Sequence, residues 1–177
     1  SSDLETTRTD HLTGLTNRRG FFERGEAAIK RALTQSQVVS LLAFDLDHFK
    51  SINDQYGHSV GDTVLTLFAN TATEFAGPDS LLARLGGEEF ALLLVDKSSE
   101  QARVVGEAIS RTFAERSNCL DGMAIGATVS VGVAESKSTT TDLAFILGAA
   151  DRALYRAKSL GRNRIELAKT IGMSVAA

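Results

Sequence analysis

The stretch Arg84-Leu85-Gly86-Gly87-Glu88-Glu89-Phe90 contains two glycines followed by two carboxylates. It lies between two short aliphatic runs, residues 81–83 and 91–95, which are typical of buried strands. A Gly-Gly pair between such strands predicts a tight hairpin turn. Two adjacent carboxylates at this turn are costly unless a cation meets them. The pattern therefore points to a divalent metal ion that carries a phosphate ester.

A second pair of carboxylates follows another buried-strand run. Residues 38–44 are apolar apart from Ser40, and Asp45 and Asp47 come directly after them. Side chains two apart on a strand share a face, so both carboxylates point the same way if the strand continues. Carboxylates at the exit of a buried strand commonly hold Mg²⁺, which prefers oxygen ligands. A solvated strand end is an equally good interpretation of these two residues alone.

The composition is that of one globular domain of ordinary polarity. The chain has 177 residues, of which 43% are hydrophobic and 23% charged. A net charge of −3 argues against a broad nucleic-acid-binding surface, and the single Cys119 excludes an internal disulfide framework. No apolar run approaches the roughly 18 residues that a membrane span needs. We therefore expect a cytoplasmic domain without nucleic-acid or membrane contacts, in a protein that a missing N-terminal part can anchor to a membrane.

Helical and strand-like patterns alternate along the chain. Helices are predicted at about 18–34, 49–56, 59–76, 98–116 and 142–160, and strands at 37–46, 80–85, 89–95, 127–134 and 164–167. This order, with one hairpin inside it, predicts an α+β fold in which helices cover a mixed sheet. The domain is predicted to span residues 10–167, with a linker at 1–9 and a tail at 168–177.

Five sequence blocks together resemble the GGDEF domain, the catalytic module of diguanylate cyclases, in its Gly-Gly-Glu-Glu-Phe form. They are DHLTGLTNRR (10–19), FDLDHFKSIND (44–54), GHSVGDTVL (57–65), RLGGEEF (84–90) and ADRALYRAKSLGRN (150–163), in the family's order. The resemblance implies a central sheet with a ferredoxin-like core, similar to adenylate cyclase and polymerase palm domains. It also implies the condensation of two GTP molecules into cyclic di-GMP with release of two pyrophosphates. Each 3′-hydroxyl then attacks the α-phosphate of the other nucleotide.

The resemblance implies a metal site at the two acidic stretches. Asp45, Glu88 and Glu89 would supply carboxylates, and Leu46 a backbone carbonyl. The expected cofactor is Mg²⁺, or Mn²⁺, with two ions per active site. Ions there would bridge phosphate oxygens, stabilise the leaving pyrophosphate and lower the pKa of the attacking hydroxyl. Glu88 is also the family's candidate for helping to take that proton.

The hairpin itself carries further implied roles. Gly86 and Gly87 have no side chain, so the backbone can approach the nucleotide closely. Arg84 is expected either to contact phosphate or to brace the acidic cluster, and it completes the predicted catalytic set with Asp45 and Glu88. A glycine hairpin without function is the alternative that the other blocks disfavour.

The guanine base must be distinguished from adenine. Asn53 and Asp62 match the family's base-reading pair, since an amide can read acceptors and a carboxylate can accept from the N1–H and N2–H₂ edge. Leu12, Phe49 and Leu65 would wall the base pocket, although plain core packing also explains them. Taken alone, Asn53 is typical of a helix-surface amide and Asp62 of a helix cap.

Three cations correspond to the family's phosphate contacts: Lys50, Lys158 and Arg162. Lys158 and Arg162 are four residues apart near a helix end, so they can project from one side. Cations there also complement the helix dipole, which is the alternative interpretation. Backbone N–H groups following the strand at 37–46 would face the β- and γ-phosphates. Asp47 and His58 are left without an assigned role.

One feature departs from many family members, which carry an inhibitory product site with the pattern Arg-x-x-Asp. Here those two positions are Gly77 and Ser80. Neither residue can bind a guanine edge or a phosphate through charged hydrogen bonds as Arg and Asp would. The primary inhibitory site is therefore expected to be absent.

The implied partners are GTP, a second copy of the domain in a transient two-fold dimer, and an N-terminal sensory or regulatory domain in the full-length protein. The alternative is a catalytically inert GGDEF module that serves as a GTP sensor or protein-interaction domain. Loss of acidic or glycine positions usually marks such modules, and this sequence retains them. A cyclase that makes a different nucleotide product is the third possibility.

Overall fold

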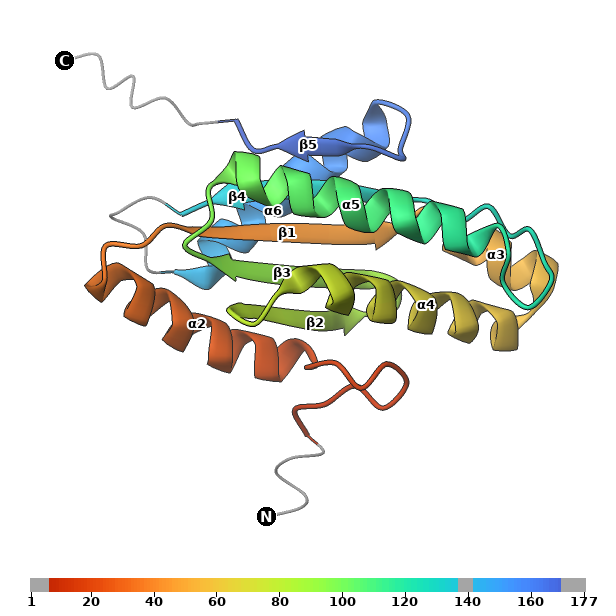
Figure 1. The fold of residues 1–177 in the computed structure, drawn as a ribbon, viewed down its shortest axis with the longest axis horizontal. Coiled ribbons are helices and arrows are strands. Elements are labelled where there is room, and N and C mark those ends of the chain that lie inside the picture. The colour runs from red at the N-terminus through yellow and green to blue at the C-terminus, as the bar shows by residue number, and fades with distance from the viewer. Residues whose placement is uncertain (1–6, 137–141, 170–177) are drawn as a thin grey trace.

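A computed structural model describes residues 7–136 and 142–169 of the chain. They form a five-stranded sheet with helices on both faces (Figure 1). The strands are β1 (Val39–Leu46), β2 (Ser80–Gly86), β3 (Glu89–Val95), β4 (Val129–Glu135) and β5 (Ile165–Leu167). The helices are α2 (Arg18–Thr34), α3 (Phe49–Tyr56), α4 (His58–Ala76), α5 (Ser99–Ser117) and α6 (Leu143–Ser159).

The sheet is mixed and runs in the order β2-β3-β1-β4-β5. Neighbouring strands are antiparallel except for β4 and β5, which are parallel. The predicted α+β fold with a mixed sheet is confirmed. Of the predicted terminal segments, residues 1–6 and 170–177 lie outside the described part of the chain.

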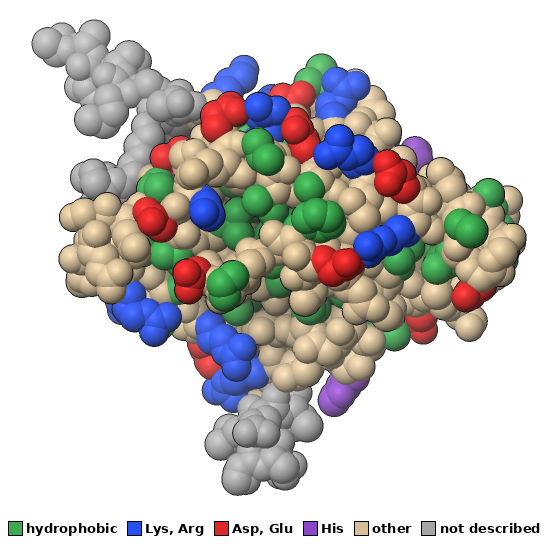
Figure 2. Space-filling view, in the orientation of Figure 1, with side chains coloured by type: hydrophobic (Ala, Val, Ile, Leu, Met, Phe, Trp, Pro, Cys, Tyr) green, Lys and Arg blue, Asp and Glu red, His purple; other side chains and the backbone are tan. Residues whose placement is uncertain are grey.

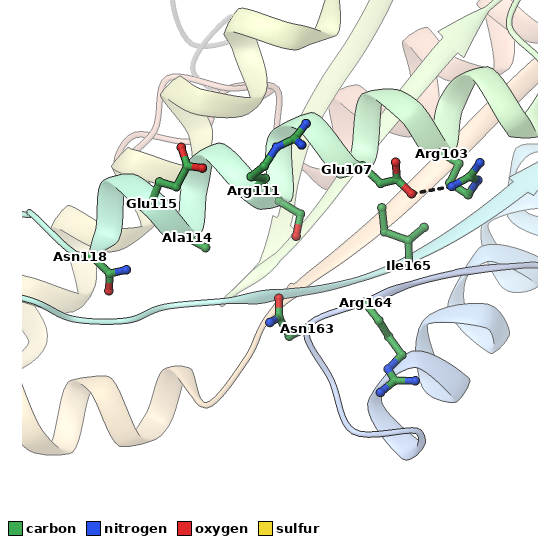
Figure 3. A pocket seen from close by; sticks show the side chains of 10 residues that line it. Arg103, Glu107, Arg111, Ala114, Glu115, Asn118, Asn163, Arg164 and Ile165 are labelled. Atoms are coloured by element: carbon green, nitrogen blue, oxygen red, sulfur yellow. Dashed lines mark hydrogen bonds and ion pairs between the residues drawn. The ribbon is translucent and has the colours of Figure 1, made fainter.

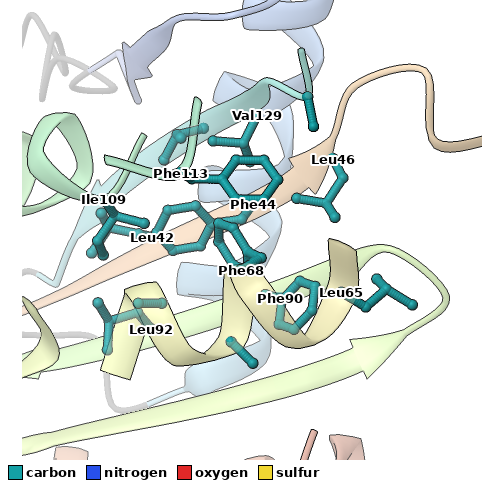
Figure 4. Close-up of a cluster of buried hydrophobic side chains, with 14 of the residues drawn as sticks. Leu42, Phe44, Leu46, Leu65, Phe68, Phe90, Leu92, Ile109, Phe113 and Val129 are labelled. Atoms are coloured by element: carbon teal, nitrogen blue, oxygen red, sulfur yellow. The ribbon is translucent and has the colours of Figure 1, made fainter. Parts of the chain in front are cut away.

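Each face of the sheet carries its own hydrophobic core because side chains alternate along the strands. Leu42, Phe44 and Leu46 of β1 pack beneath α4 and α5, whereas Leu41 and Ala43 pack beneath α2 and α6. In the first core, the rings of three phenylalanines, Phe44, Phe90 and Phe113, surround the ring of Phe68 at centroid distances of 4.6 to 5.3 Å (Figure 4). These two cores fix which face each functional side chain of β1 and β3 reaches.

Helix α6 lies unusually close to the sheet at Gly132. A Cβ atom on Gly132 would lie 2.1 Å from the carbonyl oxygen of Ala150 and 2.3 Å from the backbone nitrogen of Leu154. Only glycine allows this approach, so the backbone of α6 rests directly on β4. The consequence is that the C-terminal end of α6 is held close to the end of β1.

The surface over α4 and α5 carries mixed charge. Lys and Arg side chains alternate with Asp and Glu across this face in Figure 2. None of the helices within residues 7–136 and 142–169 combines the length and the apolar character needed to cross a membrane.

Candidate active site

The acidic residues meet where β1 ends and β3 begins. Asp45, the penultimate residue of β1, pairs in register with Glu89, the first residue of β3. Asp45 points to the α6 face because Leu41 and Ala43, at two-residue steps before it, pack there. Glu89 follows the same rule, since Ala91 and Leu93 belong to the same core. The sheet therefore places two carboxylates side by side, and the Asp45 residue is only 7% exposed.

The turn between β2 and β3 is the Gly-Gly hairpin that the sequence predicts. Gly87 has a φ of +42°, a conformation that favours glycine, and a Cβ on Gly86 or Gly87 would meet no atom within 4 Å. Both glycines therefore leave open space above the turn. The turn is joined to β1 by a hydrogen bond of 3.2 Å that the Leu46 N–H donates to the Glu88 carbonyl.

Arg84 stabilises this turn through two contacts. Its Nε donates to the Gly87 carbonyl at 2.9 Å, and its Nη1 forms an ion pair with Asp10 at 3.2 Å. Burial alone would raise the pKa of the Asp10 carboxyl, but hydrogen bonds from Thr13 and the charge of Arg84 outweigh it and lower that pKa. Arg84 therefore holds the turn next to Glu88 without contacting a carboxylate of the acidic cluster through a hydrogen bond, and its expected contact with phosphate stays a prediction.

Lys158 is the counter-ion of the acidic pair. Its Nζ donates to Asp45 Oδ2 at 2.7 Å, from the last turn of α6. The pKa of Glu89 is raised, first by burial and then by the negative charges of Asp45, Asp151 and Glu88, although Lys158 lowers it in part. The Lys158 ammonium thus lies near several carboxylates, and the negative charges of this cluster outnumber the positive ones.

Three residues near this cluster were given no role in the site from the sequence. Arg18, Asp151 and Tyr155 line a hollow of about 200 Å³ together with Asp45 and Glu89. Burial raises the pKa of the Asp151 carboxyl, while nearby cations, Arg18 first among them, oppose the shift. Arg18 and Asp151 are members of the first and last sequence blocks, which was the only signal available for them.

Asp47 and Asp45 have different hydrogen-bond partners, although both carboxylates face residues from β4 and α6 or their ends. Asp47 accepts hydrogen bonds from Thr128 Oγ1 at 2.7 Å, from Ser130 Oγ at 2.6 Å and from the Asn163 N–H at 3.0 Å. The strand ends at Leu46, so the predicted sharing of one strand face does not extend to a shared ligand site. Asp47 is 4% exposed and is fully hydrogen bonded.

The predicted base-reading residues lie on α3 and α4. Asn53 packs over Gly61, whose hypothetical Cβ would lie 1.8 Å from Asn53 Oδ1, and Asp62 follows Gly61 at the exposed start of α4. Asn53 Oδ1 is buried without a hydrogen-bond partner, which is rare for a buried polar atom. Phe49 and Leu65 belong to the core beneath α4, as the packing interpretation predicts.

The remaining predicted contacts are at the rim of this region. Leu12 is 37% exposed in the opening loop, and Lys50 is exposed on α3. The N-cap residue of α3, His48, makes no side-chain hydrogen bond to the helix, so its side chain does not occupy the first N–H groups of α3. Helix α6 ends at Ser159, so the helical spacing expected for Lys158 and Arg162 does not apply. Arg162 lies instead in the loop that follows.

The described residues do not form a closed metal cage. No three His, Cys, Asp or Glu side chains within residues 7–136 and 142–169 are grouped closely enough to hold a metal ion. Mg²⁺ commonly uses one or two protein carboxylates and completes its shell with water and substrate phosphates. The paired Asp45 and Glu89, with the raised pKa of Glu89, fit such an open site.

Two larger hollows lie away from the acidic pair. One, of about 590 Å³, runs between α5 and the segment before β5 and is lined by residues that include Arg111 and Arg164 (Figure 3). The other, of about 700 Å³, lies at the start of β2 and includes Asp79 and Ser80. The Ser80 hydroxyl donates to the Gly77 carbonyl at 2.6 Å, so both positions of the missing Arg-x-x-Asp pattern form a turn.

Comparisons with known proteins identify relatives across nearly the whole chain. Residues 7–164 match the family described as "Diguanylate cyclase, GGDEF domain". The chain is 37% identical over 169 residues to "Diguanylate cyclase A" of Treponema denticola, covering 94% of this chain and 46% of that protein. It is 39% identical over 160 residues to "Diguanylate cyclase VdcA" of Vibrio cholerae, covering 88% and 45%. The chain thus spans less than half the length of these curated relatives.

Solved structures give the same result for the fold. The GGDEF domain of DgcB from Caulobacter crescentus, in complex with c-di-GMP, matches with a TM-score of 0.85 and 33% identity, covering 92% of this chain and 96% of that one. The active GGEEF domain of a diguanylate cyclase from Vibrio cholerae matches with a TM-score of 0.82 and 35% identity, covering 88% and 98%.

Proposed function

The chain belongs to the GGDEF-domain family of diguanylate cyclases, and from this premise we propose that it condenses two molecules of GTP into cyclic di-GMP and two pyrophosphates. The observation that carries this proposal is the register of β1 and β3. It places Asp45 beside Glu89, next to an open glycine turn and a single ammonium from Lys158. Such a cluster suits a polyphosphate that arrives with its own cations.

The acidic pair is proposed as the metal site. The family's diguanylate cyclases generally use a divalent metal. Asp45, Glu88 and Glu89 would hold it with the Leu46 carbonyl, as Mg²⁺ or Mn²⁺ and two ions per site. When bound, the ions would neutralise phosphate charge and lower the pKa of the attacking 3′-hydroxyl. Glu88 would then help to accept the proton, and Arg84 keeps the turn that carries Glu88 in place.

Asn53 and Asp62 are proposed to read the guanine base. The unpartnered Oδ1 of Asn53 supports this role, because a buried acceptor without a partner favours a ligand that supplies a donor, and the amino group of guanine is one. Asp62 would accept from the N1–H and N2–H₂ groups, which adenine lacks. Leu12, Phe49 and Leu65 would contact the base or the sugar.

Three cations are proposed to bind the triphosphate. Lys50 follows the uncapped start of α3, where N–H groups can also face phosphate. Lys158 and Arg162 approach from the end of α6. The guanidinium of Arg162 takes part in no hydrogen bond or ion pair within the described residues, so it is available for phosphate oxygens.

Catalysis is proposed to need two copies of the domain. One site holds one GTP, whereas the product contains two guanylates, so two subunits must present their nucleotides face to face. An N-terminal sensory or regulatory domain is proposed to control this pairing. Product is proposed to inhibit weakly, because Gly77 and Ser80 replace the arginine and aspartate of the primary inhibitory site.

Mass spectrometry of the products tests the proposal. The purified chain is incubated with Mg²⁺ and GTP alone, and then with GTP plus ATP, beside an Asp45→Ala control. Cyclic di-GMP in both reactions, and none from the control, is the expected result. Tight GTP binding without product would instead indicate an inert GTP sensor. A mixed dinucleotide would indicate a cyclase of broader specificity.

A further inference from the structure

Asp47 is a buried carboxylate for which the proposed chemistry has no use. It is 4% exposed and lies two residues after Asp45, yet it contacts neither Lys158 nor the glycine turn through any hydrogen bond. Its three donors come from Thr128, directly before β4, from Ser130 in β4 and from the loop after α6. Burying a carboxylate is costly unless hydrogen-bond donors compensate it, and the three donors that do so here tie Asp47 to two separate segments of the chain.

The loop after α6 has a strained backbone. Gly161, Arg162 and Asn163 have φ values of +121°, +65° and +49°. For residues other than glycine this left-handed conformation is unfavourable, because Cβ comes too close to the following carbonyl oxygen. Such conformations persist only where surrounding contacts hold them.

The contacts that hold the loop flank the α-carbon of Arg162 on both sides. The Arg162 N–H donates to the Ala157 carbonyl of α6 at 2.9 Å. The next amide, the Asn163 N–H, donates to Asp47 Oδ2 at 3.0 Å. Hydroxyl groups of Thr128 and Ser130 in turn hold the Asp47 carboxylate against β4. The backbone of Arg162 is thereby fixed between helix α6 and the end of β1.

We propose that Asp47 is a positioning residue that presents Arg162 to the triphosphate of the substrate. This inference rests on the proposed function, since it takes Arg162 as a phosphate contact. Asp47 acts through the Asn163 N–H and does not touch the nucleotide. Without Asp47, the backbone of Arg162 and Asn163 relaxes from the left-handed conformation. The Arg162 side chain then no longer extends from a fixed backbone position. A fixed backbone position strengthens phosphate binding by arginine most of all, because the phosphate contacts of arginine are bidentate and directional.

A double-mutant cycle on nucleotide binding tests the proposal. Affinity for a non-hydrolysable GTP analogue and for GMP is measured by calorimetry, with Mg²⁺, on the wild type, Asp47→Ala, Arg162→Gln and the double variant. Each single change should weaken binding of the triphosphate about tenfold and leave binding of GMP unchanged. The double variant should lose no more than either single one, because both changes remove the same contact.

Two further variants separate positioning from general loss of stability. Ser117→Ala removes another buried polar side chain, at the C-terminal end of α5. The Ser117 hydroxyl accepts a hydrogen bond from the Ala127 N–H at 2.9 Å. It should lower the melting temperature without changing the ratio of triphosphate to GMP affinity. If Asp47→Ala does not fold, Asp47→Asn serves in the cycle, since it keeps the volume and weakens the acceptor. Its triphosphate loss should vanish in the Arg162→Gln background.

The outcomes distinguish the inference from the proposed function. Additive losses, or equal loss of GMP and triphosphate binding, overturn the role of Asp47 even if the wild type makes cyclic di-GMP. Selective and non-additive losses in a chain that forms no product uphold the role and overturn the cyclase proposal. A wild type that binds no GTP analogue overturns both.

Discussion

Lys158 holds the carboxylate that a metal ion would need. Its Nζ lies 2.7 Å from Asp45 Oδ2, and the Asp45 side chain is 10% exposed. A metal ion that binds through Oδ2 of Asp45 must therefore displace the ammonium, and the triphosphate offers the ammonium a new partner. The sequence blocks indicated both residues as site residues, but they gave no sign of this pairing, because 113 positions separate the two.

Removing the ammonium should strengthen metal binding in the absence of nucleotide. Lys158→Gln is expected to raise Mn²⁺ affinity about fivefold, since a partly buried ion pair is worth roughly 1 kcal/mol. Electron paramagnetic resonance of free Mn²⁺ measures this directly. Arg162→Gln is the matched control, because it removes the same charge without a contact to Asp45. An equal gain in both variants would show a general charge effect and no exchange at Asp45.

Filling the space beside Asn53 should damage nucleotide recognition without harming the fold. Gly61→Ala places a methyl group where Asn53 Oδ1 lies, so the amide must turn away. Alanine is the better helix former, so the melting temperature should stay constant or rise. We expect KM for GTP to rise about tenfold and the preference over ATP to shrink. Gly148→Ala on α6, where a Cβ meets only the tip of Arg152 at 3.6 Å, is the control that should leave KM unaltered.

The raised pKa of Glu89 predicts how stability depends on pH. The folded chain disfavours the Glu89 carboxylate, so its ionisation costs stability as pH rises from the ordinary value of 4.5 through the folded pKa. Without metal, Glu89→Gln should therefore melt at a higher temperature than the wild type at neutral pH. This gain should disappear below about pH 4. Melting curves that show the same difference at both pH values would contradict the shift.

Among the elements, the β2–β3 turn depends most on a distant partner. Arg84 ties the turn to Asp10 of the opening loop, 74 positions away. The Asp10–Arg84 ion pair joins the opening loop to β2, and Asn17 caps α2 by accepting from the Gly20 N–H at 3.0 Å. The opening loop is therefore fixed at both of its ends.

Loosening the turn should affect turnover more than stability. Arg84→Gln removes the donor to the Gly87 carbonyl and the partner of Asp10, so Glu88 loses its fixed position. We expect kcat to fall at least tenfold, while the melting temperature falls by only about 2–4 °C for roughly 1 kcal/mol. Arg103→Gln removes an exposed arginine that pairs with Glu100 and Glu107 on α5, and it should change neither quantity appreciably. Equal turnover in the two variants would remove Arg84 from the catalytic set.

Most element boundaries could be predicted because hydrophobic periodicity and cap residues agree in this sequence. Helices α2 and α3 have the predicted limits, and Asp142 caps α6 by accepting from the Ala144 N–H. The predicted start of β1 at residue 37 was wrong, because the Gln37 N–H completes the end of α2 by donating to Ala32. Likewise β4 begins after Ala127, whose N–H bonds to Ser117. The first difference arises from a local hydrogen bond that closes the helix and the second from a bond between two elements, and hydrophobic periodicity reveals neither.

At the scale of the whole molecule, each domain presents one proposed GTP site, whereas the proposed product is symmetric. Specific activity should therefore rise with enzyme concentration, because two domains must meet. Fusing a dimeric coiled coil before residue 10 should raise the activity at low concentration more than tenfold, since orientation can supply several kcal/mol of the barrier. The control is a monomeric helical fusion of the same length. Activity that is flat across a wide dilution series, with a monomer seen by light scattering during turnover, would rule out the two-subunit mechanism.

The pairing of β1 with β3 fixes the position of Asp45 relative to Glu89 by a whole number of residue pairs. Seven consecutive residue pairs, from Val39 opposite Val95 to Asp45 opposite Glu89, define it. A slip of one position would carry Glu89 to the opposite face of the sheet, although every strand would keep its composition. A single inserted residue within either strand would therefore erase the site. Insertions beyond the Val39–Val95 end of the ladder leave the count intact, so the connections at that end can vary in length, whereas the β2–β3 turn at the other end carries Glu88 and is fixed with the strands.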